Sequence, residues 1–104
     1  MRRVCFVLRV KKDRIDDYLA AHQVWPEMRQ AMHDAGIRNY SMFMAKDGTI
    51  VNYLEAEDPE EALRKAGQSD VSGRWHQYMA EYLETSGAQQ TEDVQWLDEF
   101  FYMA

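Results

Sequence analysis

The fold is decided by one stretch, residues 37–57, which reads IRNYSMFMAKDGTIVNYLEAE. Apolar and aromatic residues recur through it on both sides of the dipeptide Asp47-Gly48, as is typical of strands. An Asp-Gly pair between two such runs is a strong hairpin signal, because both central positions of the tight turn take positive φ. We therefore predict strands over residues 37–46 and 49–57, paired as an antiparallel hairpin.

The chain before this hairpin predicts a strand and a broken helix. Apolar residues alternate with others over residues 3–10, which favours a strand. Asp13 follows a polar turn and is the predicted N-cap of a helix over residues 14–24. Pro26 breaks that helix or begins a second one as its first-turn proline, and Gly36 is the stop signal after the second segment.

Two more helices follow the hairpin. Asp58 is the predicted N-cap of a short helix that carries Pro59 in its first turn and reaches about Ala66. Asp70 or Ser72 is the predicted cap of the next helix. Both helices are predicted from local start signals in the sequence.

The last predicted elements are an exposed polar connection over residues 85–92 and a strand over residues 94–103. The order strand, helix, strand, strand, helix, strand is that of the ferredoxin-like βαββαβ fold. We therefore expect an α+β protein with one antiparallel four-stranded sheet and helices on one face. A chain of 104 residues forms one domain, spanning residues 1–104.

Both faces of the predicted sheet carry large apolar side chains. Met42 and Phe43 lie on opposite sides of one strand, and Phe100 and Phe101 lie on opposite sides of the last strand. A sheet with helices on one face only has a polar second face. The second face therefore needs an apolar partner, and the simplest is a second copy of the same sheet. We expect a homodimer of the dimeric α/β-barrel type.

Charge and composition exclude several partners. The chain carries 18 acidic and 12 basic side chains, a net charge of -6. An acidic protein repels phosphate backbones, so nucleic acid is not an expected partner. The single cysteine, Cys5, allows no intrachain disulfide. No secretion signal and no membrane-spanning apolar run are visible, so we expect a cytoplasmic protein without membrane contact.

The histidines predict acid–base chemistry without a metal or cofactor. His22, His33 and His76 stand in no metal-ligand spacing, and no glycine-rich loop follows a strand. A neutral-pKa imidazole remains as the best chemical group. His22 is the main candidate because it lies in the middle of an apolar helix face, with Tyr18 one turn earlier on the same face.

A second imidazole stands beside an aromatic ring, at Trp75-His76 on the later helix. Aromatic rings stack on the apolar face of a sugar, while imidazoles and hydroxyls bind its OH groups, so the combination indicates a small polyhydroxylated substrate. Each of these residues also has an alternative explanation that involves no function. His22, Tyr18 and Trp75 are also explained as core or interface residues, and His76 as a solvent-facing side chain.

Several motifs distributed along the chain occur together in one known family. They are Tyr18 through His22, Trp25-Pro26-Glu27, Gly36 with Asn39-Tyr40, Asp70-Val71, Arg74-Trp75, Tyr78-Met79 and Phe100-Phe101-Tyr102. With these motifs the sequence resembles the L-rhamnose mutarotases, small dimeric α+β barrel proteins, over nearly its whole length. A tyrosine, a histidine four residues later and then Trp-Pro-Glu form the most specific part of the resemblance.

The resemblance implies an isomerase, a sugar mutarotase that interconverts the α and β anomers of a 6-deoxy hexose. It implies that His22 is the catalytic proton donor and that Tyr18, Tyr40 and Trp75 bind the monosaccharide. His76 is a further binding position, where the family has a second tryptophan. That departure adds a titratable group and removes a stacking ring, so L-fucose or another deoxy sugar is an alternative to L-rhamnose.

Two other classes of protein stay open at this point. On the same dimeric barrel, a helix histidine ligates iron in a haem-binding protein or oxidoreductase, so the fold alone does not decide. A non-catalytic sensor binds the sugar without accelerating anomer exchange. Coloured purified protein favours the first class, and sugar binding without exchange favours the second.

Overall fold

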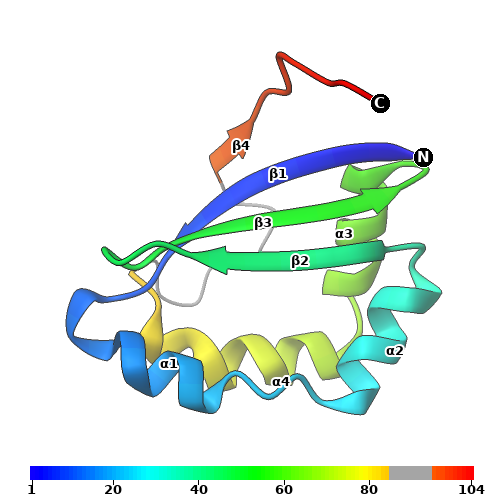
Figure 1. Cartoon of the computed structure of the whole chain (residues 1–104). Coiled ribbons are helices and arrows are strands. Elements are labelled where there is room, and N and C mark those ends of the chain that lie inside the picture. Colours follow the sequence, from blue (N-terminus) through cyan, green and yellow to red (C-terminus); the bar gives the residue numbers. More distant parts are fainter. Residues whose placement is uncertain (85–94) are drawn as a thin grey trace.

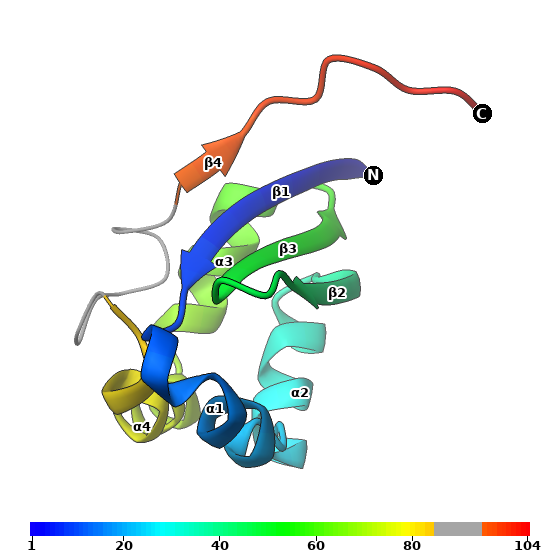
Figure 2. The same cartoon turned by 60° about the vertical axis from the view of Figure 1, so that its left-hand side comes forward.

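The computed structural model describes residues 1–84 and 95–104. Its elements in chain order are β1 (Arg2–Arg9), α1 (Ile15–Ala21), α2 (Pro26–Asp34), β2 (Arg38–Met44), β3 (Thr49–Ala56), α3 (Pro59–Gly67), α4 (Asp70–Met79) and β4 (Gln95–Leu97). The strands form one sheet in the order β2-β3-β1-β4, and each neighbouring pair is antiparallel. The helices lie on one side of this sheet (Figure 1, Figure 2). The predicted ferredoxin-like α+β fold is confirmed.

The β2–β3 hairpin forms as predicted, although its turn differs in one respect. Only Gly48 of the Asp47-Gly48 pair has a positive φ, at 91°. Asp47 instead accepts a hydrogen bond from the backbone N–H of Thr49 at 3.0 Å, an arrangement that aspartate favours in turns. A Cβ atom at position 48 would lie 2.7 Å from the backbone oxygen of Val10, so the close approach of β1 also requires glycine.

Helix α1 is shorter than predicted. It ends at Ala21, and the backbone leaves the helical region at His22, whose ψ is 69°. Trp25 is extended, with ψ of 144°, because the ring of Pro26 excludes the helical conformation from the preceding residue. Asp13 lies in a 3₁₀ turn ahead of α1 and does not cap it, contrary to our expectation. His22 therefore stands at the end of a helix rather than in its middle.

The later helices begin and end largely as their local signals indicate. Asp58 caps α3 by accepting a hydrogen bond from the N–H of Glu61, and Gly36 follows the end of α2 with φ of 100°. The cap of α4 is Ser69, whose hydroxyl accepts a hydrogen bond from the N–H of Ser72 at 3.2 Å. The predicted caps of α4, Asp70 and Ser72, are therefore wrong by one and three residues.

Strand β4 is the largest difference from the sequence prediction, because it covers only Gln95–Leu97. Val94 and the predicted connection over residues 85–92 lie outside the described residues. Residues 98–104, called the C-terminal arm below, leave the sheet and extend away from the rest of the chain (Figure 1, Figure 2). Arg3 of β1 contacts this arm at two residues, with an ion pair to Glu99 at 2.7 Å and its guanidinium 3.7 Å from the ring centre of Tyr102.

The core between sheet and helices consists of two clusters. One contains Phe6, Leu54 and Leu63 and joins the sheet to α3. The other contains Trp75 and Met79 and joins α4 to α1, α2 and one end of the sheet. Residues of both clusters line the cavity described next.

Candidate active site

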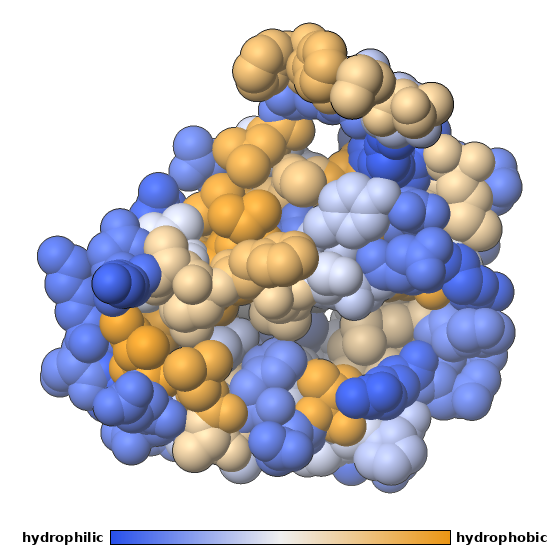
Figure 3. Space-filling model, viewed as in Figure 1, coloured by the Kyte–Doolittle hydropathy of each residue, from blue (hydrophilic) through white to orange (hydrophobic). Residues whose placement is uncertain are grey.

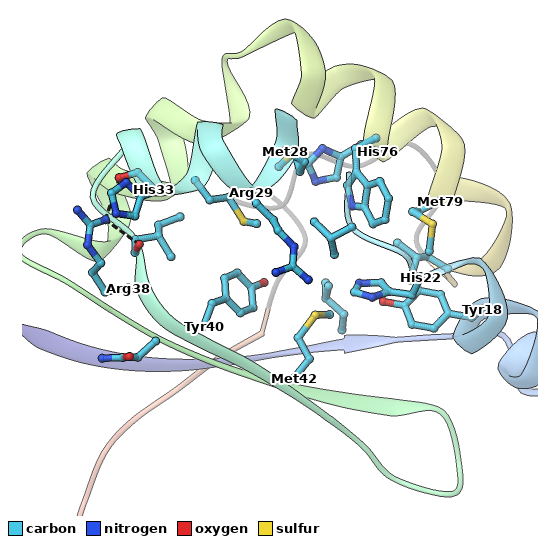
Figure 4. Close-up of a pocket in the computed structure, with 17 residues that line it drawn as sticks. Tyr18, His22, Met28, Arg29, His33, Arg38, Tyr40, Met42, His76 and Met79 are labelled. Carbon is cyan, nitrogen blue, oxygen red and sulfur yellow. Dashed lines mark hydrogen bonds between the residues drawn. The ribbon is translucent and has the colours of Figure 1, made fainter. Parts of the chain in front are cut away.

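A cavity of about 610 Å³ lies between the sheet and helices α1, α2 and α4 (Figure 4). This volume is within the range of small-molecule sites. All five residues singled out from the sequence line it: Tyr18 of α1, His22 after α1, Tyr40 of β2, and Trp75 and His76 of α4. The fold therefore brings together side chains that lie up to 58 positions apart in the sequence (from 18 to 76).

The imidazole of His22 packs between two aromatic rings. Its ring centre is 5.3 Å from that of Tyr18 and 5.5 Å from that of Trp75, which meets it edge to face at 79°. Burial lowers the pKa of His22 below its ordinary value, and a backbone hydrogen bond of the same residue offsets part of this effect. Neutral imidazole is therefore the main form of His22 at pH 7.

Tyr18 offers a hydroxyl that stays protonated. Only 5% of the residue is exposed, and burial raises the pKa of Tyr18 to about 12. The hydroxyl makes no hydrogen bond with any residue in 1–84 or 95–104, and it lies beside His22 at the cavity (Figure 4). Tyr18 is thus able to donate a hydrogen bond to a ligand oxygen and unable to act as a base at neutral pH.

Tyr40 is held by a buried residue that the sequence analysis did not single out. Its hydroxyl donates a hydrogen bond to Oδ1 of Asn52 at 3.0 Å. Asn52 is fully buried, and its Nδ2 donates to the backbone oxygen of Phe6 at 3.3 Å. The signal in the sequence is a polar residue at an inward position of β3, between Ile50 and Leu54. Asn52 fixes the orientation of the Tyr40 hydroxyl in the cavity.

This pair predicts a difference in stability between two tyrosine variants. We expect Tyr40→Phe to lower the free energy of unfolding by about 1–3 kcal/mol, because the buried carbonyl of Asn52 loses its hydrogen-bond donor. Tyr18→Phe removes a hydroxyl without a partner in the described chain and is expected to change that free energy by less than about 0.5 kcal/mol. Urea denaturation of both variants measures the difference, and equal effects would contradict it.

The tautomer of His76 follows from its contacts. Nδ1 of His76 lies 2.7 Å from the backbone oxygen of Ser72. A carbonyl oxygen only accepts, so Nδ1 carries the proton and donates it to this bond. In the neutral ring, Nε2 then keeps its lone pair, and His76 is a proton acceptor on the cavity wall.

The Trp-Pro-Glu motif connects two helices around the site. Trp75 is 8% exposed, and the ring of Trp25 meets it at 5.1 Å and 84°. Nearby, Arg74 of α4 pairs with Glu27 of α2 at 3.1 Å. These contacts fix the start of α2 against α4, so Trp75 forms a rigid wall that supports His22.

Among the residues that the structure describes, the lining includes arginines and histidines and no acidic side chain. Arg29 of α2, which the sequence analysis also missed, points its guanidinium into the cavity between Tyr40 and His22 (Figure 4). Among residues 1–84 and 95–104, no group of three His, Cys, Asp or Glu side chains is placed to hold a metal. In the same residues, no helix has the length and apolar character needed to cross a membrane.

These features define a class of protein. An α+β domain of the dimeric-barrel fold class encloses a small-molecule cavity that holds two imidazoles and tyrosine hydroxyls. Such a set provides general acid–base chemistry from the protein's own side chains. The comparisons with known proteins then identify the family.

The family model described as L-rhamnose mutarotase matches residues 3–103. The L-rhamnose mutarotase of Bacillus subtilis (strain 168) is 35% identical over 88 residues, covering 83% of this chain and 84% of the relative. That of Shouchella clausii (strain KSM-K16) is 34% identical over the same coverage. The chain belongs to the L-rhamnose mutarotase family. It is therefore an isomerase of the kind that acts on carbohydrate anomers, and both the predicted resemblance and the predicted class of enzyme are confirmed.

Solved structures agree with this fold. The crystal structure of an L-rhamnose mutarotase from Formosa agariphila superposes with a TM-score of 0.82 at 23% identity and covers all of both chains. Tetracenomycin F2 cyclase from Streptomyces glaucescens, a polyketide cyclase, gives a TM-score of 0.66 at 21% identity, covering 100% of this chain and 98% of that one. At these identities the likeness concerns the fold alone, since unrelated chemistries share it.

Proposed function

We propose that this protein interconverts the α and β anomers of a free 6-deoxy hexose, with L-rhamnose as the first substrate to test and L-fucose as the alternative. The observation that carries the proposal is the convergence of Tyr18, His22, Tyr40, Trp75 and His76 on one cavity. The family to which the chain belongs supports the choice of L-rhamnose.

The reaction needs two proton transfers and no net change in protonation. Protonated His22 gives its proton to the ring oxygen, while a base removes the proton of the anomeric hydroxyl. The bond between C1 and the ring oxygen breaks, and C1 becomes an aldehyde. After rotation about the C1–C2 bond, the ring closes on the other face of C1. Closure returns both protons, so the enzyme regains its initial state.

His76 is the base that best complements His22. Tyr18 is excluded from this role because its pKa of about 12 keeps it protonated. His76 has a free lone pair on Nε2 in the neutral ring, since Nδ1 donates to the backbone oxygen of Ser72. We therefore assign the anomeric hydroxyl to His76, and Tyr18 and Tyr40 to sugar oxygens. General acid and general base catalysis each contribute about 10²–10⁴-fold.

Saturation-transfer NMR between the α and β H-1 signals tests the choice of sugar. We expect faster enzyme-dependent exchange for L-rhamnose than for L-fucose in the wild-type protein. His76→Trp replaces an acid–base group by a stacking ring, so we expect a changed ratio between the two sugars. An unchanged exchange rate for both sugars in this variant would contradict a role of His76 in the site, and faster exchange of L-fucose by the wild type would replace L-rhamnose as the substrate.

We also propose that the protein is a homodimer, formed by the open face of the sheet and the C-terminal arm. The arm exposes large apolar side chains, and Phe100 is 97% exposed. Phe43 and Leu97 are exposed on the sheet face opposite the helices. Apolar side chains gather on the arm and on the surface below it (Figure 3). Apolar area of this kind marks an interface, and a two-fold axis lets each copy cover the other.

We place the enzyme in the cytoplasm, where free monosaccharides enter metabolism. Its single cysteine, Cys5, can form no intrachain disulfide, which agrees with a reducing compartment.

A further inference from the structure

Arg29 is the cation of the cavity that the rest of the fold leaves available. It lies on α2 directly after the buried Met28, and its guanidinium points into the cavity (Figure 4). It makes no hydrogen bond or ion pair with any residue of the described chain. The other arginine of the lining, Arg38, donates to the backbone oxygens of His33 and Ile37 at 2.8 and 2.9 Å. Arg38 is therefore engaged in the fold, and Arg29 is not.

Arg29 is exposed to solvent at the cavity, and no carboxylate of residues 1–84 or 95–104 pairs with it. The chain has 18 acidic residues and a net charge of -6, yet none of the acidic residues within 1–84 and 95–104 lines the cavity. The two carboxylates of α2 are engaged elsewhere. Glu27 pairs with Arg74 at 3.1 Å, and Asp34 accepts a hydrogen bond from Gln30 at 2.7 Å. A positive cavity in a negative protein favours an anionic ligand group.

The chemistry of the site places that anionic group on the sugar. In a pyranose, C6 is attached to C5, and C5 carries the ring oxygen. If His22 protonates the ring oxygen, the C6 substituent lies close to His22. Figure 4 shows Arg29 beside His22 on this part of the cavity wall, together with Met42. Met42 suits the C6 methyl of a 6-deoxy sugar, while the planar guanidinium suits a carboxylate, which it binds through two parallel hydrogen bonds.

We propose that Arg29 is a specificity-determining residue that binds a carboxylate at C6, so that the enzyme also interconverts the anomers of free hexuronic acids. This inference rests on the proposed function, because it uses the same His22 and His76 proton transfers and the same ring opening. The carboxylate takes no part in these transfers. It supplies binding energy at the end of the sugar that carries a methyl group in L-rhamnose.

Saturation-transfer NMR with matched sugars tests the proposal. The substrates are D-galacturonate, its neutral counterpart D-galactose, and L-rhamnose. We expect the wild type to give a kcat/KM for D-galacturonate at least tenfold above that for D-galactose. In Arg29→Gln, we expect the ratio of kcat/KM for D-galacturonate to that for L-rhamnose to fall about 10- to 100-fold, mainly through KM. Arg29→Lys keeps the positive charge but loses the planar guanidinium with its two parallel donors. Its ratio of kcat/KM values is expected to lie between those of the wild type and Arg29→Gln.

Controls separate the possible outcomes. Arg64 lies on α3 outside the cavity lining and pairs with Glu61, so Arg64→Gln is expected to leave the ratio unchanged. Circular dichroism confirms that each variant is folded. Exchange of L-rhamnose without any enzyme-dependent exchange of D-galacturonate overturns this inference and leaves the proposed function standing. Equal losses for both sugars in Arg29→Gln also overturn it, because Arg29 then binds shared hydroxyl groups. If the wild type exchanges none of the sugars, the proposed function itself fails.

Discussion

Replacing His22 by Asn is expected to lower kcat/KM for anomer exchange of L-rhamnose by about 10²–10⁴-fold, the usual contribution of a general acid. Asparagine keeps a polar side chain at the end of α1 but has no titratable nitrogen. The packing of Tyr18 and Trp75 around this position is retained in part, so the loss reports chemistry more than folding. The measurement is saturation-transfer NMR at matched enzyme concentrations.

The neighbouring position supplies the control for this variant. Gln23 is exposed and does not line the cavity. Gln23→Ala is therefore expected to exchange L-rhamnose at the wild-type rate, and thermal unfolding of both variants checks that they are folded. Wild-type exchange in His22→Asn would show that another group protonates the ring oxygen.

The pH dependence of the wild type adds a signature that folding alone does not produce. Because burial lowers the pKa of His22 below the ordinary value of 6.5, its protonated form is the minor one at pH 7 and grows as the pH falls. We expect kcat/KM to rise as the pH falls from 8, because protonated His22 becomes more abundant, and to fall again once the base is protonated, which gives a bell-shaped profile. The same rise towards lower pH in His22→Asn would contradict the assignment of the acid.

Deleting the C-terminal arm, residues 98–104, is expected to convert a dimer into a monomer. The deletion removes Phe100, Phe101, Tyr102 and Met103, all of which are exposed in the single chain. Burying one such phenylalanine contributes about 1.5–3 kcal/mol, and two-fold symmetry doubles the effect. We therefore expect the dissociation constant of the dimer to rise by at least about 100-fold. Light scattering coupled to size-exclusion chromatography measures the mass.

A variant of full length guards against effects of the deletion on folding. Phe100→Ser with Phe101→Ser keeps the ion pair between Arg3 and Glu99 and is expected to weaken the dimer as well. Leu19 is 52% exposed on α1, far from the arm in sequence, so Leu19→Ser is the matched control and should stay dimeric. A monomeric wild type at tens of micromolar, or a dimeric deletion variant, would contradict the role of the arm.

Local rules predict most of the elements of this fold. The hairpin around Gly48, the start of α3 at Asp58 and the end of α2 at Gly36 each follow from one residue whose backbone or side chain acts within a few positions. The rules fail where several residues compete or act at a distance. Ser69, Asp70 and Ser72 are all good caps, and the sequence contains no feature that selects Ser69. Pro26 constrains only Trp25 directly, so the end of α1 at Ala21 was not visible.

The sequence predicts some residues of the candidate site and misses others. The spacing of Tyr18 and His22 and the adjacency of Trp75 and His76 single these residues out, whereas Tyr40 came from the family resemblance, because its place in the site depends on tertiary structure. Asn52 and Arg29 were missed for the same reason. A polar residue at an inward strand position is a weak signal, and an exposed arginine on a helix gives no signal until the cavity is known.

We propose that this cavity opens and recloses the ring of a free sugar, and saturation transfer between the anomeric protons of L-rhamnose measures that reaction itself. At pH 7, with wild-type protein and no added metal or cofactor, we expect an α-to-β exchange rate that rises in proportion to enzyme concentration above the buffer rate. An exchange rate that stays at the buffer value at every enzyme concentration, for both L-rhamnose and L-fucose, would contradict the account.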